Sequence, residues 1–171
     1  MISVFYTTYE GNKNQSRVGK ALLGFVLNKY YDISIKNVNI ERQERGKPYF
    51  ADLPLFFSVS HSGGVVALAV SENEVGIDVE PMRDISRQVG IKYLGIDTDD
   101  KKILLREWIR RESYGKLTGE GFFHSGVTEP IFQKEYHLKS GYNKYYLCVS
   151  SRVDAFPKSC IFIEPDIINK S

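Results

Sequence analysis

Two acidic residues, Asp78 and Glu80, lie two positions apart in the otherwise apolar stretch Gly76-Ile77-Asp78-Val79-Glu80. If this stretch forms a strand, Ile77 and Val79 point into a core and both carboxylates project from the opposite face. Two negative charges held side by side favour a cation between them. Mg²⁺ commonly uses one or two carboxylates, while water and substrate phosphate fill its other positions. The stretch therefore suggests a metal site that handles phosphate. The alternative is that the acids are solvated charges that protect an edge strand from pairing.

A third carboxylate, Glu112, is expected on a long helix that begins near residues 97–100. Glu112 shares one helix face with Leu105, Ile109 and Lys116, because these residues are spaced four, three and four positions apart. A carboxylate in line with apolar residues is costly to bury without a partner. Glu112 therefore either takes part in chemistry or forms an ordinary ion pair with Lys116, worth only about 0.2–0.5 kcal/mol.

Residues 60–64 (Ser-His-Ser-Gly-Gly) separate two apolar runs, 55–59 and 65–70, and predict a strand, a turn and a second strand. Glycine-rich turn geometry alone explains this pattern. The functional alternative is that the hydroxyls, the His61 imidazole and the glycine amides form a concavity for an anion such as phosphate. No Gly-x-Ser-x-Gly stretch is present, which argues against a Ser-His-Asp hydrolase.

Of two lysines, Lys20 and Lys47, the second lies where it could contact phosphate. Lys47 is held between Gly46 and Pro48 in a charged loop, and proline stiffens the chain at that point. Lys20 lies outside the apolar stripe of a predicted first helix. A solvated surface charge is the commoner role for such residues, so the sequence leaves both interpretations open.

The pattern along the chain predicts an α+β fold in which each half contributes strands and one long helix, arranged like a sandwich. The boundary between the halves is expected near residues 71–74. The first half is expected to contain a strand over 2–9, a helix over about 14–29 capped by Asn14 or Ser16, an irregular strand over 32–40 and the strands described above. Short helical or loop segments are expected over 81–97, followed by a helix that begins at a Thr98 N-cap, carries acids in its first turn and ends near residue 117. A turn-rich stretch over 119–130 and strands over 131–138, 145–150 and 159–163 are expected in the rest of the chain.

Composition narrows the class of protein. Lys and Arg number 23 against 21 Asp and Glu, so no global positive charge favours a nucleic-acid partner. Cys148 and Cys160 are the two cysteines, and their spacing indicates neither a disulfide framework nor a zinc site. The chain begins without a signal peptide and contains no run of membrane-spanning length. A cytoplasmic protein that does not bind a membrane is expected.

Four motifs occur in a fixed order: residues 46–48 (Gly-Lys-Pro), 58–63 (Ser-Val-Ser-His-Ser-Gly), 76–80 and 108–116 (Trp-Ile-Arg-Arg-Glu-Ser-Tyr-Gly-Lys). Together they resemble the motifs of the 4′-phosphopantetheinyl transferase superfamily, in its Sfp-type branch with two fused lobes. The resemblance runs from the first helix to the last strands. It implies two similar α+β lobes related by a pseudo-twofold axis, with an N-terminal lobe over 1–73 that binds the nucleotide and a C-terminal lobe over 74–171 that carries the metal and catalytic residues.

The resemblance also implies the activity. Such an enzyme transfers 4′-phosphopantetheine from coenzyme A to a serine of an acyl or peptidyl carrier protein, with Mg²⁺ as cofactor, and releases 3′,5′-ADP. The roles implied by the matching positions are metal ligation by Asp78, Glu80 and Glu112, coenzyme A binding by Lys20, Lys47, Ser60, His61 and Lys116, and catalysis by Glu112 and Lys116. Whether Glu112 is also the general base is left open, because a metal-bound carboxylate is a weak base. The alternatives are a metal-dependent phosphohydrolase that acts on coenzyme A and a non-catalytic module that binds coenzyme A or a carrier protein.

The chain departs from the family pattern in two ways. Arg111 stands where the pattern prefers lysine, which keeps the charge but changes the donor geometry. The chain is also short for the two-lobed branch, mainly in the N-terminal lobe and in residues 83–97, which in relatives help to receive the carrier protein. Because both lobes are expected in one chain, a monomer is expected.

Overall fold

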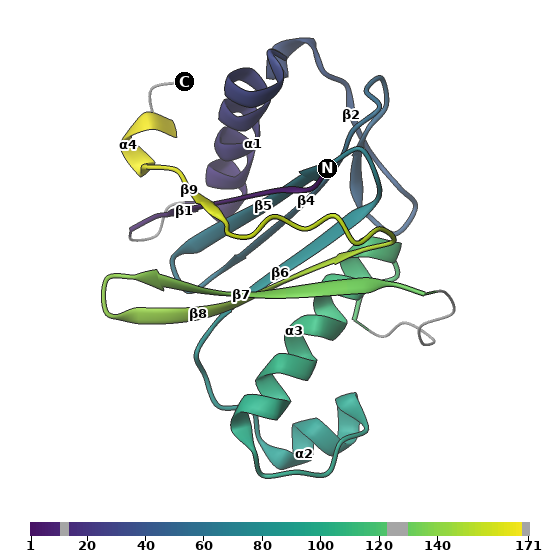
Figure 1. The fold of residues 1–171 in the computed structure, drawn as a ribbon, viewed down its shortest axis with the longest axis vertical. Helices are drawn as coiled ribbons and strands as arrows, with labels where there is room; N and C mark the ends of the chain where they lie inside the picture. The colour runs from purple at the N-terminus through teal and green to yellow at the C-terminus, as the bar shows by residue number, and fades with distance from the viewer. Residues whose placement is uncertain (11–13, 123–129, 169–171) are drawn as a thin grey trace.

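The computed structural model describes residues 1–10, 14–122 and 130–168, and has a mixed α+β fold with several β-sheets. Helix α1 (Gln15–Tyr31) lies above the strands and helix α3 (Lys101–Thr118) lies beneath them in Figure 1. The strands between the two helices form two main sheets, so the described chain is layered as helix, sheet, sheet and helix. The predicted α+β sandwich is therefore confirmed.

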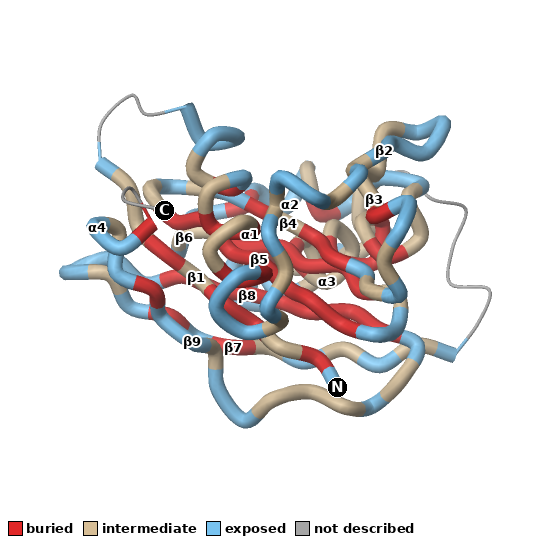
Figure 2. The backbone as a smooth tube through the Cα atoms, turned by 90° about the horizontal axis from the view of Figure 1, so that it is seen from above, coloured by how far each residue is buried: buried red, intermediate tan, exposed pale blue. Residues whose placement is uncertain are grey.

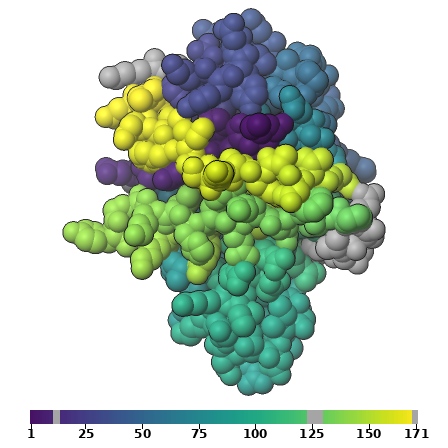
Figure 3. All heavy atoms as spheres, viewed as in Figure 1, coloured from purple at the N-terminus to yellow at the C-terminus, as the bar shows by residue number. Residues whose placement is uncertain are grey.

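The first sheet has the strand order β4-β5-β1-β9. Its central strands β1 (Ser3–Thr8) and β5 (Val65–Ser71) run antiparallel, and β4 (Phe56–Ser62) pairs with the far side of β5. Strand β9 (Ile161–Phe162) pairs in parallel with β1. The chain thus returns to its first sheet after building the second. Figure 3 shows the yellow segment that contains β9 lying beside the purple N-terminal strand.

The second sheet has the order β6-β8-β7, and every pairing in it is antiparallel. Helix α3 covers the face of this sheet that is turned away from the first sheet. The sheet is built from β6 (Val75–Pro81), β7 (Phe132–Ser140) and β8 (Asn143–Ser151).

The remaining elements are short and lie at the periphery. Two of them, β2 and β3, form a small hairpin around the charged loop. The short elements are η1 (Ile35–Asn37), β2 (Ile40–Arg42), β3 (Pro48–Phe50), α2 (Arg87–Val89), η2 (Gly90–Leu94) and α4 (Pro165–Ile168).

Strand alternation divides the buried apolar residues among three clusters, and Figure 2 shows that the buried residues concentrate in the strands. The central cluster lies between the two sheets and contains Val4, Ala67, Ile77, Val79 and Leu147. The second cluster joins α1 to the outer face of the first sheet, and the third joins α3 to the outer face of the second. As predicted, Ile77 and Val79 enter the core while the acids of the same strand face α3.

Two local predictions were wrong. Helix α3 is capped by Asp100, whose side chain accepts hydrogen bonds from the amides of Lys102 and Ile103, and its first turn contains no acid. Thr98 lies outside the helix. The strand expected over residues 32–40 is absent except for Ile40, which begins β2, because the chain leaves α1 through a left-handed Asp32 and forms the short helical turn η1 instead. Asn14, by contrast, caps α1 as expected.

The turn-rich stretch expected over 119–130 falls partly outside the described residues. Gly119 ends α3 in the left-handed conformation, as predicted. Within residues 1–10, 14–122 and 130–168, no helix is long and apolar enough to cross a membrane.

Gly76 allows α3 to pack directly on β6. A Cβ atom at this position would lie 2.1 Å from the Ser113 carbonyl oxygen and 2.3 Å from the Leu117 amide nitrogen. The glycine of the acidic stretch therefore brings the helix that carries Glu112 close to the strand that carries Asp78 and Glu80.

Gly76→Ala is expected to lower the free energy of unfolding by about 3 kcal/mol, because the backbone of α3 must move to make room for the methyl group. Urea unfolding followed by circular dichroism would measure this. Gly24→Ala in α1 is the matched control, since its Cβ meets only the Ile35 side chain, at 3.3 Å, and alanine favours a helix. Equal stability of the two variants would contradict the packing argument.

Candidate active site

The site lies where the edge strand β4 of the first sheet meets the edge strand β6 of the second. Serine hydroxyls join the two strands: Ser58 Oγ accepts a hydrogen bond from the Ile77 amide at 3.1 Å, and Ser60 Oγ accepts one from the Val79 amide at 3.3 Å. Ser62 continues the row, and its hydroxyl donates to Glu80 Oε2 at 3.0 Å. These alternate serines share one face of β4 and fix the register between the two sheets.

Asp78 is buried on the face of β6 that α3 covers. Its Oδ1 atom accepts hydrogen bonds from Ser60 Oγ and Lys116 Nζ, both at 2.8 Å. Its Oδ2 atom is buried and has no hydrogen-bond partner among the described residues. Burial raises the pKa of the Asp78 carboxyl, while Lys116 and Ser60 oppose the rise. The alternative that Asp78 is a solvated edge charge is therefore wrong.

Glu80 is mostly buried, with 17% of its side chain exposed, and is held by an arginine. Arg83 Nε donates to Glu80 Oε2 at 3.2 Å and Arg83 Nη2 donates to Oε1 at 3.3 Å, so the guanidinium grips both oxygens. Arg83 also lies over the Trp108 ring, 5.5 Å from its centroid. Arg83 was not predicted from the sequence, although its position three residues after the acidic stretch was the available signal.

Glu112 lies on α3 close enough to the other acids to interact with their charges. Burial raises the pKa of its carboxyl, the negative charges of Asp78 and Glu80 raise it further, and Lys116 opposes them. Lys116 forms its ion pair across the interface with Asp78, so the predicted alternative of a simple Glu112–Lys116 helix pair does not describe this site.

The oxygen donors of this site are compatible with a hard divalent cation. Within the part of the chain that the structure describes, no three His, Cys, Asp or Glu side chains are grouped closely enough to form a metal site by themselves. Mg²⁺ does not require such a cage, since it commonly uses one or two carboxylates and takes its remaining oxygens from water and phosphate. The buried, unpartnered Oδ2 of Asp78 is an oxygen that could bind such a cation, and Glu80 and Glu112 are the neighbouring acids.

Lys47 lies at the other end of the site, beside the last turn of α3. Its ammonium donates a hydrogen bond to the Leu117 carbonyl at 2.5 Å, and burial lowers its pKa. An adjacent, mostly apolar pocket of about 280 Å³ brings together three of the sequence motifs. Its lining comes from the loop (Arg45, Gly46, Lys47, Pro48), from β4 (Phe57, Ser58, Val59) and from the end of α3 (Gly115, Lys116, Gly119, Gly121).

His61 and Lys20 lie away from the carboxylates. His61 is exposed and alternates with the serines along β4, so it belongs to the opposite face of that strand. Val59, on the same face as His61, packs against α1 at Gly19, whose Cβ would lie 3.2 Å from Val59 Cγ1. Lys20 is exposed and follows Gly19. Asp78, Glu80 and Glu112 therefore form an acidic group beside α3, whereas His61 and Lys20 lie on the α1 side of β4.

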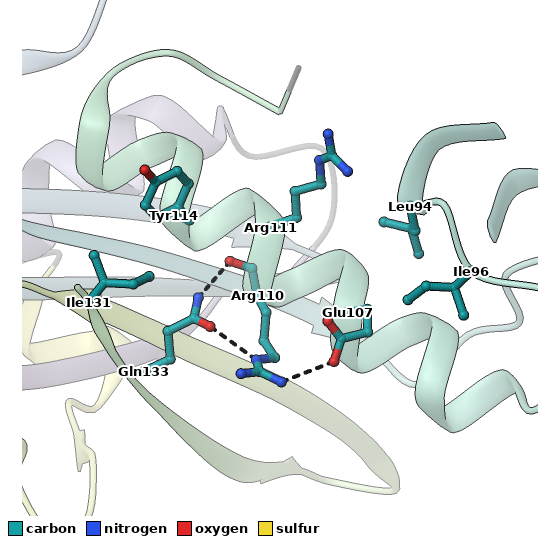
Figure 4. A pocket seen from close by; sticks show the side chains of 8 residues that line it. All are labelled: Leu94, Ile96, Glu107, Arg110, Arg111, Tyr114, Ile131 and Gln133. Atoms are coloured by element: carbon teal, nitrogen blue, oxygen red, sulfur yellow. Dashed lines mark hydrogen bonds and ion pairs between the residues drawn. The ribbon is translucent and has the colours of Figure 1, made fainter. Parts of the chain in front are cut away.

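Arg111 has a structural role that its sequence position did not suggest. Its guanidinium donates to the backbone carbonyls of Tyr93 at 2.8 Å and Phe122 at 3.0 Å, and lies over the Phe122 ring. Figure 4 shows that Arg111 and Arg110 diverge on a face of α3 that lines a separate pocket of about 290 Å³. Arg111 therefore links α3 to η2 and to the segment that follows α3.

Comparison with known proteins gives a consistent family relationship. Residues 3–73 match the family described as 4′-phosphopantetheinyl transferase, N-terminal. The chain is 26% identical over 125 residues to 4′-phosphopantetheinyl transferase Sfp of Bacillus subtilis, an alignment that covers 66% of this chain and 55% of the relative. It is 28% identical over 117 residues to 4′-phosphopantetheinyl transferase psf-1 of Bacillus pumilus, covering 61% and 49%. It is also 28% identical over 127 residues to 4′-phosphopantetheinyl transferase HetI of a Nostoc strain, covering 64% and 54%.

The chain thus spans about half the length of these curated relatives. The resemblance identified from the four motifs is confirmed by these matches. The mixed α+β structure with several sheets is consistent with the same family.

Glu112→Gln is expected to make the free protein more stable near pH 7 and to leave its stability unchanged near pH 3.5. The pKa of Glu112 is higher in the folded protein than in the unfolded chain. The free energy of unfolding therefore falls as the pH rises from the ordinary glutamate pKa through the raised pKa of the folded state. Thermal unfolding at both pH values would measure the difference. Glu107→Gln, on the same helix but more exposed, is the control and should give no stabilisation. A destabilised Glu112→Gln protein at pH 7 would refute this account.

Proposed function

Because this chain is related to the 4′-phosphopantetheinyl transferases of the Sfp type, we propose that it transfers 4′-phosphopantetheine from coenzyme A to a serine of an acyl or peptidyl carrier protein and releases 3′,5′-ADP. The observation that best supports this is the buried Asp78, which pairs with Lys116 through one oxygen and leaves the other without a partner. Burying a carboxylate oxygen without a partner costs free energy unless a ligand binds to that oxygen.

The nucleotide of coenzyme A is proposed to bind along β4 and the Gly46–Pro48 loop. The apolar pocket beside Lys47 suits a flat aromatic base, and Lys47 and Ser60 border the same junction. Lys20 and His61, both exposed on the α1 side of β4, are the proposed ligands of the 3′-phosphate. Lys116, at the floor of the junction, is proposed to contact the diphosphate.

Asp78, Glu80 and Glu112 are the residues that would hold Mg²⁺. When bound, the metal would supply positive charge to the diphosphate oxygens and help to orient them. The support for this assignment is the oxygen-only donor set and the unpartnered Asp78 Oδ2.

The reaction is proposed to proceed by in-line displacement at phosphorus. The carrier serine oxygen forms a bond to the phosphorus that bears pantetheine, and the bond from that phosphorus to the oxygen of the leaving 3′,5′-ADP breaks. Glu112, directly or through a water, is proposed to take the serine proton. Lys116 stabilises the negative charge that develops on the leaving group.

We also propose how the chain is organised around this reaction. Residues 1–73 would form the nucleotide-binding lobe and residues 74–171 the catalytic lobe, related by a pseudo-twofold axis that places α1 and α3 in equivalent positions. The protein would act as a monomer, because both lobes are supplied by one chain. We also propose that it acts in the cytoplasm.

Two other functions make different predictions. A phosphohydrolase would use the same acids to activate water and would release ADP without a carrier. A module that only binds coenzyme A or a carrier would not need Glu112. The acidic group and Lys116 support an enzyme over the binding module.

The test is to incubate the protein with coenzyme A, Mg²⁺ and a panel of apo carrier proteins and to weigh the carriers by intact-mass spectrometry. A gain of one phosphopantetheine group on the carrier serine is expected. Glu112→Ala should slow it by about 100-fold or more, since a general base typically contributes that much. Chelation of the metal should also abolish the gain.

Glu107→Ala is the matched control for this assay, because it removes a carboxylate from the other side of α3 and should transfer at close to the normal rate. Hydrolysis of coenzyme A without any carrier modification would favour the phosphohydrolase. Binding of coenzyme A with no chemistry would favour the binding module.

A further inference from the structure

The acidic group carries its own counter-ions. Lys116 pairs with Asp78 at 2.8 Å, and Arg83 pairs with Glu80 through both guanidinium contacts. Three carboxylates therefore face two fixed cations, and the group retains only about one negative charge when all five residues are ionised. A divalent cation arriving alone would be weakly attracted.

Arg83 is well placed to hold its partner. The backbone around it is anchored, since the Met82 amide donates to the Lys144 carbonyl at 2.9 Å and Pro81 pairs with Tyr145 at the end of β6. The Trp108 ring lies under the guanidinium. The arginine is 41% exposed, so it can leave Glu80 without crossing the core. By contrast, Lys116 is inserted between Ser60 and Asp78.

Most lone pairs of the Glu80 carboxylate already accept hydrogen bonds. A carboxylate offers about four lone-pair positions. Ser62 and Arg83 Nε use two on Oε2, and Arg83 Nη2 uses one on Oε1. A metal ion must either displace the arginine or accept an oxygen whose charge the arginine already offsets. In both cases Arg83 lowers the affinity of the site for a free divalent cation.

We propose that Arg83 sets the metal affinity of this site by competing for Glu80, so that the protein takes up Mg²⁺ together with a diphosphate and not as the free ion. The diphosphate supplies the negative charge and oxygen ligands that the neutralised acids lack. This inference rests on the proposed function for the identity of the ligand. It adds that the protein without a bound diphosphate has a low affinity for Mg²⁺, and that Arg83 causes this low affinity.

The test compares Mg²⁺ binding by isothermal titration calorimetry, with the metal alone and in the presence of coenzyme A. Arg83→Gln should bind Mg²⁺ alone about tenfold more tightly than the unaltered protein, because one charge-assisted pair at Glu80 is removed. Coenzyme A should therefore enhance metal affinity less in Arg83→Gln than in the unaltered protein. Arg83→Lys, which keeps the charge but loses the two-point contact, should fall between the two.

Two further variants test whether the change in Mg²⁺ affinity is specific to Arg83 and acts through Glu80. Arg87→Gln is the matched control, since Arg87 is an arginine of the same segment that pairs with Asp97 and Asp99 outside the site. It should change Mg²⁺ affinity by less than about twofold. The double variant Glu80→Gln with Arg83→Gln should bind no more tightly than Glu80→Gln alone, because the effect acts through Glu80.

Unchanged or weaker Mg²⁺ binding by Arg83→Gln, in a protein whose thermal unfolding is still cooperative, would overturn the inference and assign Arg83 a supporting role for Glu80. If the carrier assay shows transfer while Arg83→Gln behaves like Arg87→Gln, this inference alone fails. If no carrier is modified and no protein binds Mg²⁺ with or without coenzyme A, both the inference and the proposed function fail.

Discussion

The ion pair between the buried Asp78 and the partly exposed Lys116 is the interaction on which the rest of the site depends. It joins the edge strand of the second sheet to the helix that covers it, and Ser60 adds a contact from the first sheet at the same oxygen. Replacing a buried ion pair with apolar residues is often neutral or stabilising, so such a pair is weak evidence for a purely structural role. Its retention here is better explained by what the remaining oxygen of Asp78 can bind.

The packing around the pair follows from small residues placed at the points of closest approach. Gly76 has no side chain where α3 crosses β6, and Ser58 and Ser60 offer hydroxyls where the two edge strands meet. A serine hydroxyl can both accept from a backbone amide and donate to a carboxylate. The junction can therefore satisfy the amides of β6 and orient Asp78 with the same side chains.

Much of this organisation could be predicted from the sequence because strand alternation and helix periodicity are local properties. They correctly assigned Asp78 to the face opposite Ile77 and placed Glu112 and Lys116 on one stripe of α3. The partners of those residues could not be predicted in the same way. Lys116 reaches Asp78 across a tertiary contact, and the partners of Arg111 depend on how η2 and the segment after α3 pack against that helix. Thr98 was predicted as the cap because both it and Asp100 are good N-cap types, and only packing decides between them.

The parallel pairing of β9 with β1 has a consequence for the order in which the protein folds. Strand β1 is made well before residues 161–162, which supply the neighbour at one of its edges. Pairing across so great a separation in sequence is slow, because a long loop must close first. During synthesis the first sheet therefore carries an open edge, a feature that favours pairing with other chains. Pairing of β9 with β1 covers that edge and joins segments from both halves of the chain, so the two halves are expected to gain their final stability together.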